Sequence, residues 1–417
     1  MKQTSGTSWK PAGPPPTIGL AQRDRHWSRT RSFLAENGLS ALVVGGFRGR
    51  ESFETYLSGE SLQGAVVFPA VGEPVYLTWS AFRKIGRSDP DDEREYWIED
   101  LRPGLIGPGI LAALRELALE RARVGVVGLT SRNPMELEGC IPYGVWAPVA
   151  AGLPDADFVE VSGPYSLLMM EKDEEELRLA RHAAGVGERA CQVMLDATRA
   201  GASESEIYAA VAGSIYAAGL TLTPPSLIIR SGVGRLAWGP PDWGVAPIPP
   251  RRIAAGDLVY AELMPSYGGI EAQQQMTITV GKPGPLVREL AAVARASYDA
   301  GLRALRPGLL FSELFEAMAQ PLRDAECWHL STLVHSVSPA TLLGVSHGGV
   351  EKAFGAEYPW LRPRPISMDA ELREGMLFSF EPNACRGRTR VNIGGTVAVR
   401  AGGAEELNSI CCRLNES

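Results

Sequence analysis

The sequence predicts an α/β protein built from two parts, and three observations support this fold class. Residues 21–166 alternate helical and strand patterns, with short apolar runs such as ALVVGG between the helical stretches. Residues 167–417 open with a long, charged helical stretch and continue with strands that carry polar residues. A chain of 417 residues is long enough for two hydrophobic cores. We therefore expect an α/β domain with a mixed sheet, followed by a second domain of helices and strands.

The elements of the first part follow from periodicity and from turn residues. A helix is expected over residues 23–37, and Gly38 ends it. Strands are expected over residues 41–46, 64–70, 74–79, 123–130 and 157–163. A second helix is expected over residues 109–119. Residues 1–20 have no apolar stretch of the signal-peptide kind, so we interpret them as a flexible leader.

The second part begins near residue 167 and has clear helix signals. A charged helix is expected over residues 172–199, and Gly201 ends it. Ser203 and Glu206 form a capping-box pattern for the next helix, which ends near Gly219. Strands are expected over residues 226–232, 257–263, 271–280, 376–382 and 396–401, and two helices surround residues 307–308.

Composition excludes several classes of function. The net charge of -7 argues against general nucleic-acid binding, which needs a basic surface. No apolar run is long enough to span a bilayer, so a cytoplasmic location without membrane partners is expected. Six scattered cysteines fit neither a zinc knuckle nor a disulfide scaffold, which indicates reduced thiols. Cys385 follows a candidate active-site strand, but a buried thiol that acts as a small apolar group is the simpler interpretation.

Polar side chains stand on strands that are otherwise apolar. Glu262 follows the run LVYA, and Glu381 follows MLFSF. Burying a carboxylate is costly unless it is paired or bound to a metal, so each of these residues is a candidate site residue. For one such residue alone, the ordinary interpretation is a carboxylate at the end of a strand that remains in water. Alternation along residues 271–280 places Gln273 and Gln275 on one face of a strand, which either binds a polar ligand or faces solvent. His347 lies between glycines in GVSHGG, where the backbone can approach a ligand closely.

The order and spacing of six segments resemble the creatinase/prolidase/methionine aminopeptidase superfamily. The segments are PSLIIRSGVGRLAW, GDLVYAELMPSYGG, IEAQQQMTITVG, GVSHGGVEKAF, EGMLFSFEPNA and RVNIGGTVAV. The resemblance implies a creatinase-type N-terminal domain over residues 21–166 and a "pita-bread" domain over residues 167–417. For the second domain, the resemblance implies a curved antiparallel sheet covered by helices. It also implies a homodimer.

The peptidases of this superfamily bind two metal ions through Asp, Asp, His, Glu and Glu. By resemblance these positions fall on Glu262, Gln273, His347, Glu381 and Gly394. An amide cannot serve as a bridging anion, and glycine has no side chain. Because divalent ions prefer a full ligand set, we expect a site without metal and without another cofactor.

Two catalytic histidines of the superfamily are also replaced, because their positions fall on Trp238 and Phe354. Creatinase is a metal-free member, but its general-base histidine also falls on Trp238, and its active-site Glu falls near Gln275. Its chemistry therefore does not carry over intact.

We expect His347, Glu381 and Glu262 to perform acid–base catalysis, since a His beside two carboxylates can hold and move protons near neutral pH. His335 is a further candidate. Substrate-binding residues are expected to be Arg230, Arg235, Trp238, Gln273, Gln275 and Phe354.

The functional hypothesis is a metal-independent, creatinase-like enzyme that hydrolyses a C–N bond in a small nitrogen-containing metabolite, or performs a related lyase step. Two alternatives remain open at this point. One is a non-catalytic protein that binds a ligand or peptide, and the other is a divergent metallopeptidase or metal-dependent lyase.

Overall fold

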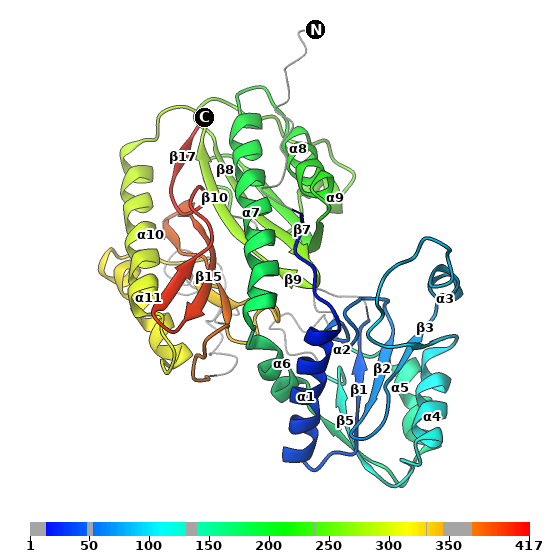
Figure 1. The fold of residues 1–417 in the computed structure, drawn as a ribbon. Coiled ribbons are helices and arrows are strands. Elements are labelled where there is room, and N and C mark those ends of the chain that lie inside the picture. The colour runs from blue at the N-terminus through cyan, green and yellow to red at the C-terminus, as the bar shows by residue number, and fades with distance from the viewer. Residues whose placement is uncertain (1–13, 48–52, 131–139, 237, 331, 345–368) are drawn as a thin grey trace.

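The computed structural model describes residues 14–47, 53–130, 140–236, 238–330, 332–344 and 369–417. Among these residues, a six-stranded and a nine-stranded β-sheet are each packed with helices, and a third sheet has only two strands (Figure 1). We call residues 20–160 the N-terminal lobe and residues 204–417 the C-terminal lobe. Two consecutive helices, α6 (Ser162–Met170) and α7 (Glu174–Ala197), connect them.

The N-terminal lobe contains α1 (Leu20–Glu36), β1 (Ala41–Gly45), α2 (Thr55–Ser58), β2 (Ala65–Pro69), β3 (Val75–Thr78), α3 (Ala81–Gly86), β4 (Asp100–Pro103), α4 (Ile106–Glu116), β5 (Arg123–Val127), α5 (Tyr143–Gly152) and β6 (Asp157–Glu160). The C-terminal lobe contains α8 (Glu204–Ala217), β7 (Thr221–Ser231), α9 (Asp242–Val245), β8 (Leu258–Tyr267), β9 (Ile270–Glu271), β10 (Gln274–Thr279), α10 (Pro285–Ala304), α11 (Phe311–Asp324), β11 (Val334–Ser336), β12 (Leu377–Phe380), β13 (Asn383–Arg386), β14 (Thr389–Asn392), β15 (Gly394–Arg400), β16 (Gly403–Glu406) and β17 (Asn415–Glu416).

The sheet of the N-terminal lobe is mixed, as the sequence predicts. Its strand order is β4-β3-β2-β1-β5-β6, with antiparallel β1–β2 and β2–β3 pairs and parallel pairs elsewhere. Side chains alternate across β1, so Leu42 and Val44 pack with α1 and α2, whereas Ala41 and Val43 pack with α4 and α5. Both faces of the sheet are therefore covered by helices.

The sheet of the C-terminal lobe has one apolar and one polar face. Its central order among the described residues is β11-β12-β15-β10-β8-β7, and these neighbours are antiparallel. Alternate residues such as Ala261, Met276 and Val397 join the main core with residues of α7, α8, α10 and α11. The opposite face carries the polar side chains that the sequence singles out, such as Glu262 and Gln275, so these side chains lie on the face away from the main core.

Helix α7 begins with a complete capping box. The Asp173 side chain accepts hydrogen bonds from the backbone N–H groups of Glu175 and Glu176, and Glu176 bonds back to the Asp173 N–H. The equivalent box at Ser203 and Glu206 opens α8, as predicted. Both boxes satisfy N–H groups that the first helical turn leaves without partners.

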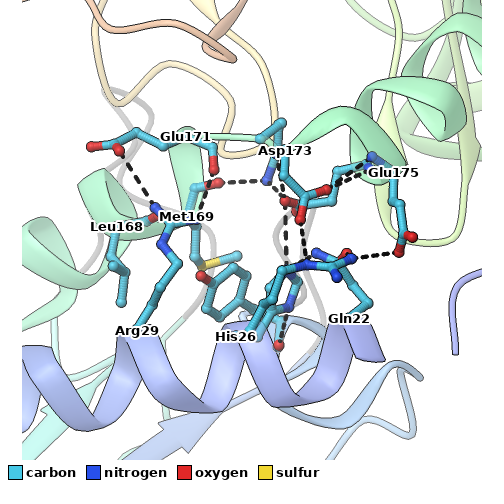
Figure 2. A network of polar contacts seen from close by, with 12 residues as sticks. Gln22, His26, Arg29, Leu168, Met169, Glu171, Asp173 and Glu175 are labelled. Carbon is cyan, nitrogen blue, oxygen red and sulfur yellow. Dashed lines mark hydrogen bonds and ion pairs between the residues drawn. The ribbon is translucent and has the colours of Figure 1, made fainter. Parts of the chain in front are cut away.

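Polar contacts connect α1 to the α6–α7 segment (Figure 2). Arg29 donates to the Leu168 and Glu171 carbonyls at 3.0 and 2.9 Å. Beside it, the buried Glu176 carboxylate lies 3.6 Å from Lys172 Nζ and 3.5 Å from His26 Nε2. A buried polar cluster therefore joins α1 of the N-terminal lobe to the start of α7. Lys172 is next to Glu171 and Asp173, which also face α1 (Figure 2).

The predicted boundary at residue 167 falls within α6, between the two sheets, and stays a prediction. In the described part of the chain, every helix is too short or too polar to cross a lipid bilayer. The predicted cytoplasmic location stays a prediction.

Candidate active site

Strand pairing brings the candidate residues of the C-terminal lobe onto one face of the sheet. Glu262 of β8 is paired with Gln275 of β10, which is paired with Gly394 of β15. On β12 and β11, Ser379 is paired with His335. Paired residues of antiparallel strands point to the same side, so this face carries a continuous polar row. Glu262, Gln275 and His335 are all buried.

His335 and Glu381 form a buried pair at one end of the row. His335 Nε2 lies 2.8 Å from Glu381 Oε1, and the two side chains are 3% and 1% exposed. His335 Nδ1 lies 2.8 Å from the Ser336 carbonyl oxygen, which can only accept, so Nδ1 carries a proton. A second proton must then lie between Nε2 and Oε1, either on the imidazole or on the carboxyl group. The pair thus holds one transferable proton away from water.

Glu262 is held at the other end of the row by an indole. Trp238 Nε1 donates to Glu262 Oε2 at 2.9 Å, which fixes the orientation of this buried carboxylate. The Trp238 ring also faces a cation, since Arg390 Cζ lies 4.4 Å from its centre and 4.3 Å from the centre of the Tyr260 ring. Trp238 therefore links a carboxylate to an arginine.

Amide side chains occupy the middle of the row. Gln273 Nε2 donates to Glu271 Oε1 at 2.6 Å, and Asn392 Nδ2 donates to Gln275 Oε1 at 3.2 Å. Gln273 Oε1 and Gln275 Nε2 are buried and have no hydrogen-bond partner within the described structure. Buried polar atoms of this kind are rare and indicate a missing partner such as water or a ligand. The polar face predicted for residues 271–280 is therefore buried, and is not exposed to solvent.

Gly394 has a backbone conformation and surroundings that exclude a side chain. Its φ is +148°, and a Cβ atom there would lie 1.8 Å from the Phe380 carbonyl oxygen. A carboxylate side chain, which the resemblance implies for this position in the peptidases, would therefore not fit the backbone of this protein.

The two arginines predicted to bind substrate share an acidic partner. Arg230 is buried and forms an ion pair of 2.6 Å with Asp242, and Arg235 lies 3.8 Å from the same carboxylate. Their substrate-binding role stays a prediction. His347 and Phe354 lie outside the described residues.

Cys385 is wholly buried, and this burial raises the pKa of its thiol to about 12. The thiol is therefore no nucleophile at neutral pH, in line with the simpler of its two interpretations.

The described residues do not fit a two-metal centre. Among them, no three His, Cys, Asp or Glu side chains come together in a group that could hold a metal ion. The resemblance assigns the positions of the bridging carboxylates to Gln273 and Gly394, and this assignment stays a prediction; both residues are buried. No step of the mechanism below passes through a metal.

Comparison with known proteins identifies the family. Residues 178–401, more than half of the chain, match the family described as "Metallopeptidase family M24". The chain belongs to this family.

Individual relatives agree with this assignment. An uncharacterized peptidase of Bacillus subtilis, YqhT, is 26% identical over 176 residues, which are 42% of this chain and 48% of that protein. The chain thus matches about half the length of this relative. The Xaa-Pro dipeptidase of Pyrococcus furiosus is 25% identical over 305 residues, which are 70% of this chain and 81% of the dipeptidase.

Solved structures show the fold. The X-Pro aminopeptidase of Thermotoga maritima superimposes with a TM-score of 0.72, covering 94% of this chain and 99% of that one at 17% identity. The predicted superfamily and the fold of an α/β domain with a pita-bread domain are thereby confirmed.

The predicted function was wrong. A metal-independent, creatinase-like enzyme for a small nitrogen metabolite is contradicted by relatives that are Xaa-Pro dipeptidases and by a family of metallopeptidases. Even if the predicted ligand positions are replaced, such a replacement does not by itself change the class of substrate.

Two residues of the site, His335 and Arg390, were difficult to predict from the sequence. His335 ranked behind His347, because its partner Glu381 is 46 residues away. Arg390 is not among the site residues that the sequence predicts. The alternation of Arg390 and Asn392 along TRVN, beside the polar row, is the signal that points to both.

Proposed function

We propose that the protein is a hydrolase that cleaves a peptide bond in short peptides, with Xaa-Pro dipeptides as the first substrates to test. Membership of the M24 family and similarity to Xaa-Pro dipeptidases support this proposal. The observation that carries it is the buried His335–Glu381 pair, which holds one proton on the same polar face as Glu262.

Hydrolysis of an amide adds a water oxygen to the carbonyl carbon, breaks the C–N bond and places a proton on the leaving nitrogen. The His335–Glu381 pair supplies this proton from between Nε2 and Oε1. Glu262, oriented by the Trp238 indole, accepts a proton from the attacking water. The two ends of the polar row thus take opposite roles, and transfer of the proton from Glu262 back to the pair completes the cycle.

Release of proline from a panel of Xaa-Pro dipeptides tests the proposal, with Xaa-Ala dipeptides alongside. The protein is first dialysed against a chelator and then measured with and without added Mn²⁺, Co²⁺ or Zn²⁺. We expect Glu381→Gln to lower kcat by about 100-fold or more, the usual contribution of general acid–base catalysis. Glu316→Gln changes an exposed ion-paired glutamate of α11 and serves as the matched control.

Two outcomes would refute this function. One is the absence of proline release by the wild-type protein under every metal condition. The other is equal turnover by the wild type and Glu381→Gln. A homodimer with a small-molecule substrate remains part of the proposal, and light scattering of the purified protein measures the oligomeric state.

A further inference from the structure

The orientation of the Gln275 side-chain amide follows from its neighbours. Asn392 Nδ2 lies 3.4 Å from the Met276 carbonyl oxygen, which can only accept a hydrogen bond, so the nitrogen of the Asn392 amide is on this side. The same nitrogen lies 3.2 Å from the Gln275 side chain and needs an acceptor there as well. The atom of Gln275 at this contact is therefore Oε1, and Nε2 lies on the other side of the amide.

The Nε2 group of Gln275 is a buried donor without an acceptor in the described part of the chain. The residue is 0% exposed. Buried amide N–H groups almost always have a partner, because an unsatisfied one is costly. The Asn392 contact also prevents this amide from turning round. Gln275 thus presents a fixed donor to an acceptor that arrives with a ligand, and it does not need to reorganise in order to bind it.

The register of the sheet places Gln275 between the two ends of the polar row. It is paired with Glu262 of β8 on one side and with Gly394 of β15 on the other. Glu381 comes next, because a Cβ atom at position 394 would lie 3.2 Å from the Glu381 Cα atom. Neighbouring strands are about 4.8 Å apart, so the Gln275 backbone lies about 5 Å from that of Glu262 and about 10 Å from that of Glu381. A group bound to Gln275 Nε2 is thus within reach of both carboxylates.

Gln273, the other glutamine of the row, is bonded in a different way. Its Nε2 already donates to Glu271 Oε1 at 2.6 Å, and its Oε1 is the atom without a partner among the described residues. Gln273 therefore offers an acceptor to a ligand, whereas Gln275 offers a donor. Of these two side chains, only Gln275 suits an oxygen that gains negative charge.

Such an oxygen forms in the proposed hydrolysis. Glu262 takes the proton of the attacking water, and the His335–Glu381 pair gives its proton to the leaving nitrogen, so the reacting carbonyl lies between these groups. Hydrogen bonds to a charged acceptor are about twice as strong as those to a neutral one. A fixed amide donor at the middle of the row therefore stabilises the oxyanion more than the uncharged carbonyl of the substrate.

We propose that Gln275 is a catalytic residue, whose Nε2 donates a hydrogen bond to the scissile carbonyl oxygen and stabilises the oxyanion of the tetrahedral intermediate. This inference rests on the proposed function for its reaction. The water oxygen bonds to the carbonyl carbon, the π electron pair moves to the carbonyl oxygen, and Glu262 takes the proton of the water. When the C=O double bond forms again, the C–N bond breaks and the nitrogen takes the proton of the His335–Glu381 pair.

The test measures kcat and KM for alanylproline with the full-length wild type and four variants, at the metal condition in which the wild type is fastest. Gln275→Met removes the donor at similar size, and Gln275→Glu replaces it by an acceptor. Asn392→Asp leaves Gln275 in place but turns its amide round, because the new carboxylate accepts from Nε2. Gln274→Met is the matched control, since Gln274 is also 0% exposed but packs against Gly187 of α7 on the opposite face of the sheet.

We expect Gln275→Met, Gln275→Glu and Asn392→Asp to lower kcat by about 100- to 1000-fold, as removal of one oxyanion donor does. KM should change by less than about threefold, because the lost interaction is made mainly in the transition state. A fluorinated ketone analogue of alanylproline, whose hydrate resembles the tetrahedral intermediate, should bind Gln275→Met more weakly by a factor similar to the fall in kcat. Gln274→Met should keep the kcat of the wild type, and urea unfolding checks that every variant is folded.

Three results would overturn the inference. They are a kcat of Gln275→Met within about threefold of the wild type, an equal fall of kcat in Gln274→Met, or equal losses of affinity for alanylproline and for the ketone. If wild type and Gln275→Met release proline at the same rate, the inference fails and the proposed function stands. If the wild type releases no proline but binds the ketone at least about 10-fold more tightly than Gln275→Met does, the proposed function fails and the oxyanion donor stands.

Discussion

Replacing Glu54 in the N-terminal lobe is expected to change how stability depends on pH. Glu54 is wholly buried, and Ser61 Oγ and the Tyr76 hydroxyl donate to its Oε1 at 3.0 and 3.4 Å. Its Oε2 has no hydrogen-bond partner among the described residues. Burial is the main cause that raises the pKa of this carboxyl group from 4.5 to about 7, and the hydrogen bonds oppose it.

The direction and the size of the pH effect on stability follow from these two pKa values. Between pH 4.5 and 7 the folded protein binds more protons at Glu54 than the unfolded chain, so stability falls as pH rises and levels off above pH 7. Each pKa unit corresponds to about 1.4 kcal/mol. The free energy of unfolding is therefore about 3 kcal/mol lower at pH 8, where Glu54 is ionised, than at pH 4. Glu54→Gln removes this loss.

Urea unfolding at several pH values measures this effect, with fluorescence of Trp27 and Trp97 reporting on the lobe that contains Glu54. The free-energy difference between Glu54→Gln and the wild type should shift in favour of the variant by about 3 kcal/mol between pH 4 and pH 8. Glu36→Gln, at an exposed position of α1, should show no such shift. A difference that is the same at every pH would refute the reasoning, because Glu54 would then titrate normally.

Two further predictions concern the C-terminal lobe and its junction. Gly394→Ala should destabilise the protein by more than about 2 kcal/mol in urea unfolding, since its Cβ would collide with the Phe380 carbonyl. Gly387→Ala, with φ of +55° and open space around it, should cost only about 1 kcal/mol, and equal costs would contradict this account. Glu176→Ala should cost about 3–5 kcal/mol by leaving Lys172 buried without its carboxylate. The double variant with Lys172→Met should recover part of that loss in the same assay, and additive losses would show that the pair is not coupled.

Local patterns in the sequence predicted much of the fold. The capping box at Ser203 and the alternation that places Gln273 and Gln275 on one face depend on neighbours within a few residues, and both are present in the structure. Contacts between distant segments were harder to predict. Nothing near Arg230 identifies Asp242 as its partner, because the loop after β7 determines that contact.

In the candidate site, too, features set by neighbouring residues were predicted, and contacts between distant segments were not. Glu262 and Glu381 could be recognised as buried carboxylates from the apolar runs before them. The pairing of Glu381 with His335 depends on the register of β11 and β12, which the sequence does not reveal. The metal-free metabolite hydrolase was inferred from missing ligands, and the match of residues 178–401 to a metallopeptidase family, with similarity to an Xaa-Pro dipeptidase over 70% of the chain, outweighs that argument.

The close approach of Gly394 to the Phe380 carbonyl also affects how this protein can change during evolution. Most lost side chains can return by a single substitution, because the space for them persists after the loss. Here the backbone of β12 occupies that space, so a Glu at position 394 requires β15 to move away from β12 first. A single substitution at position 394 therefore cannot place a carboxylate on this side of the sheet without a shift of the backbone.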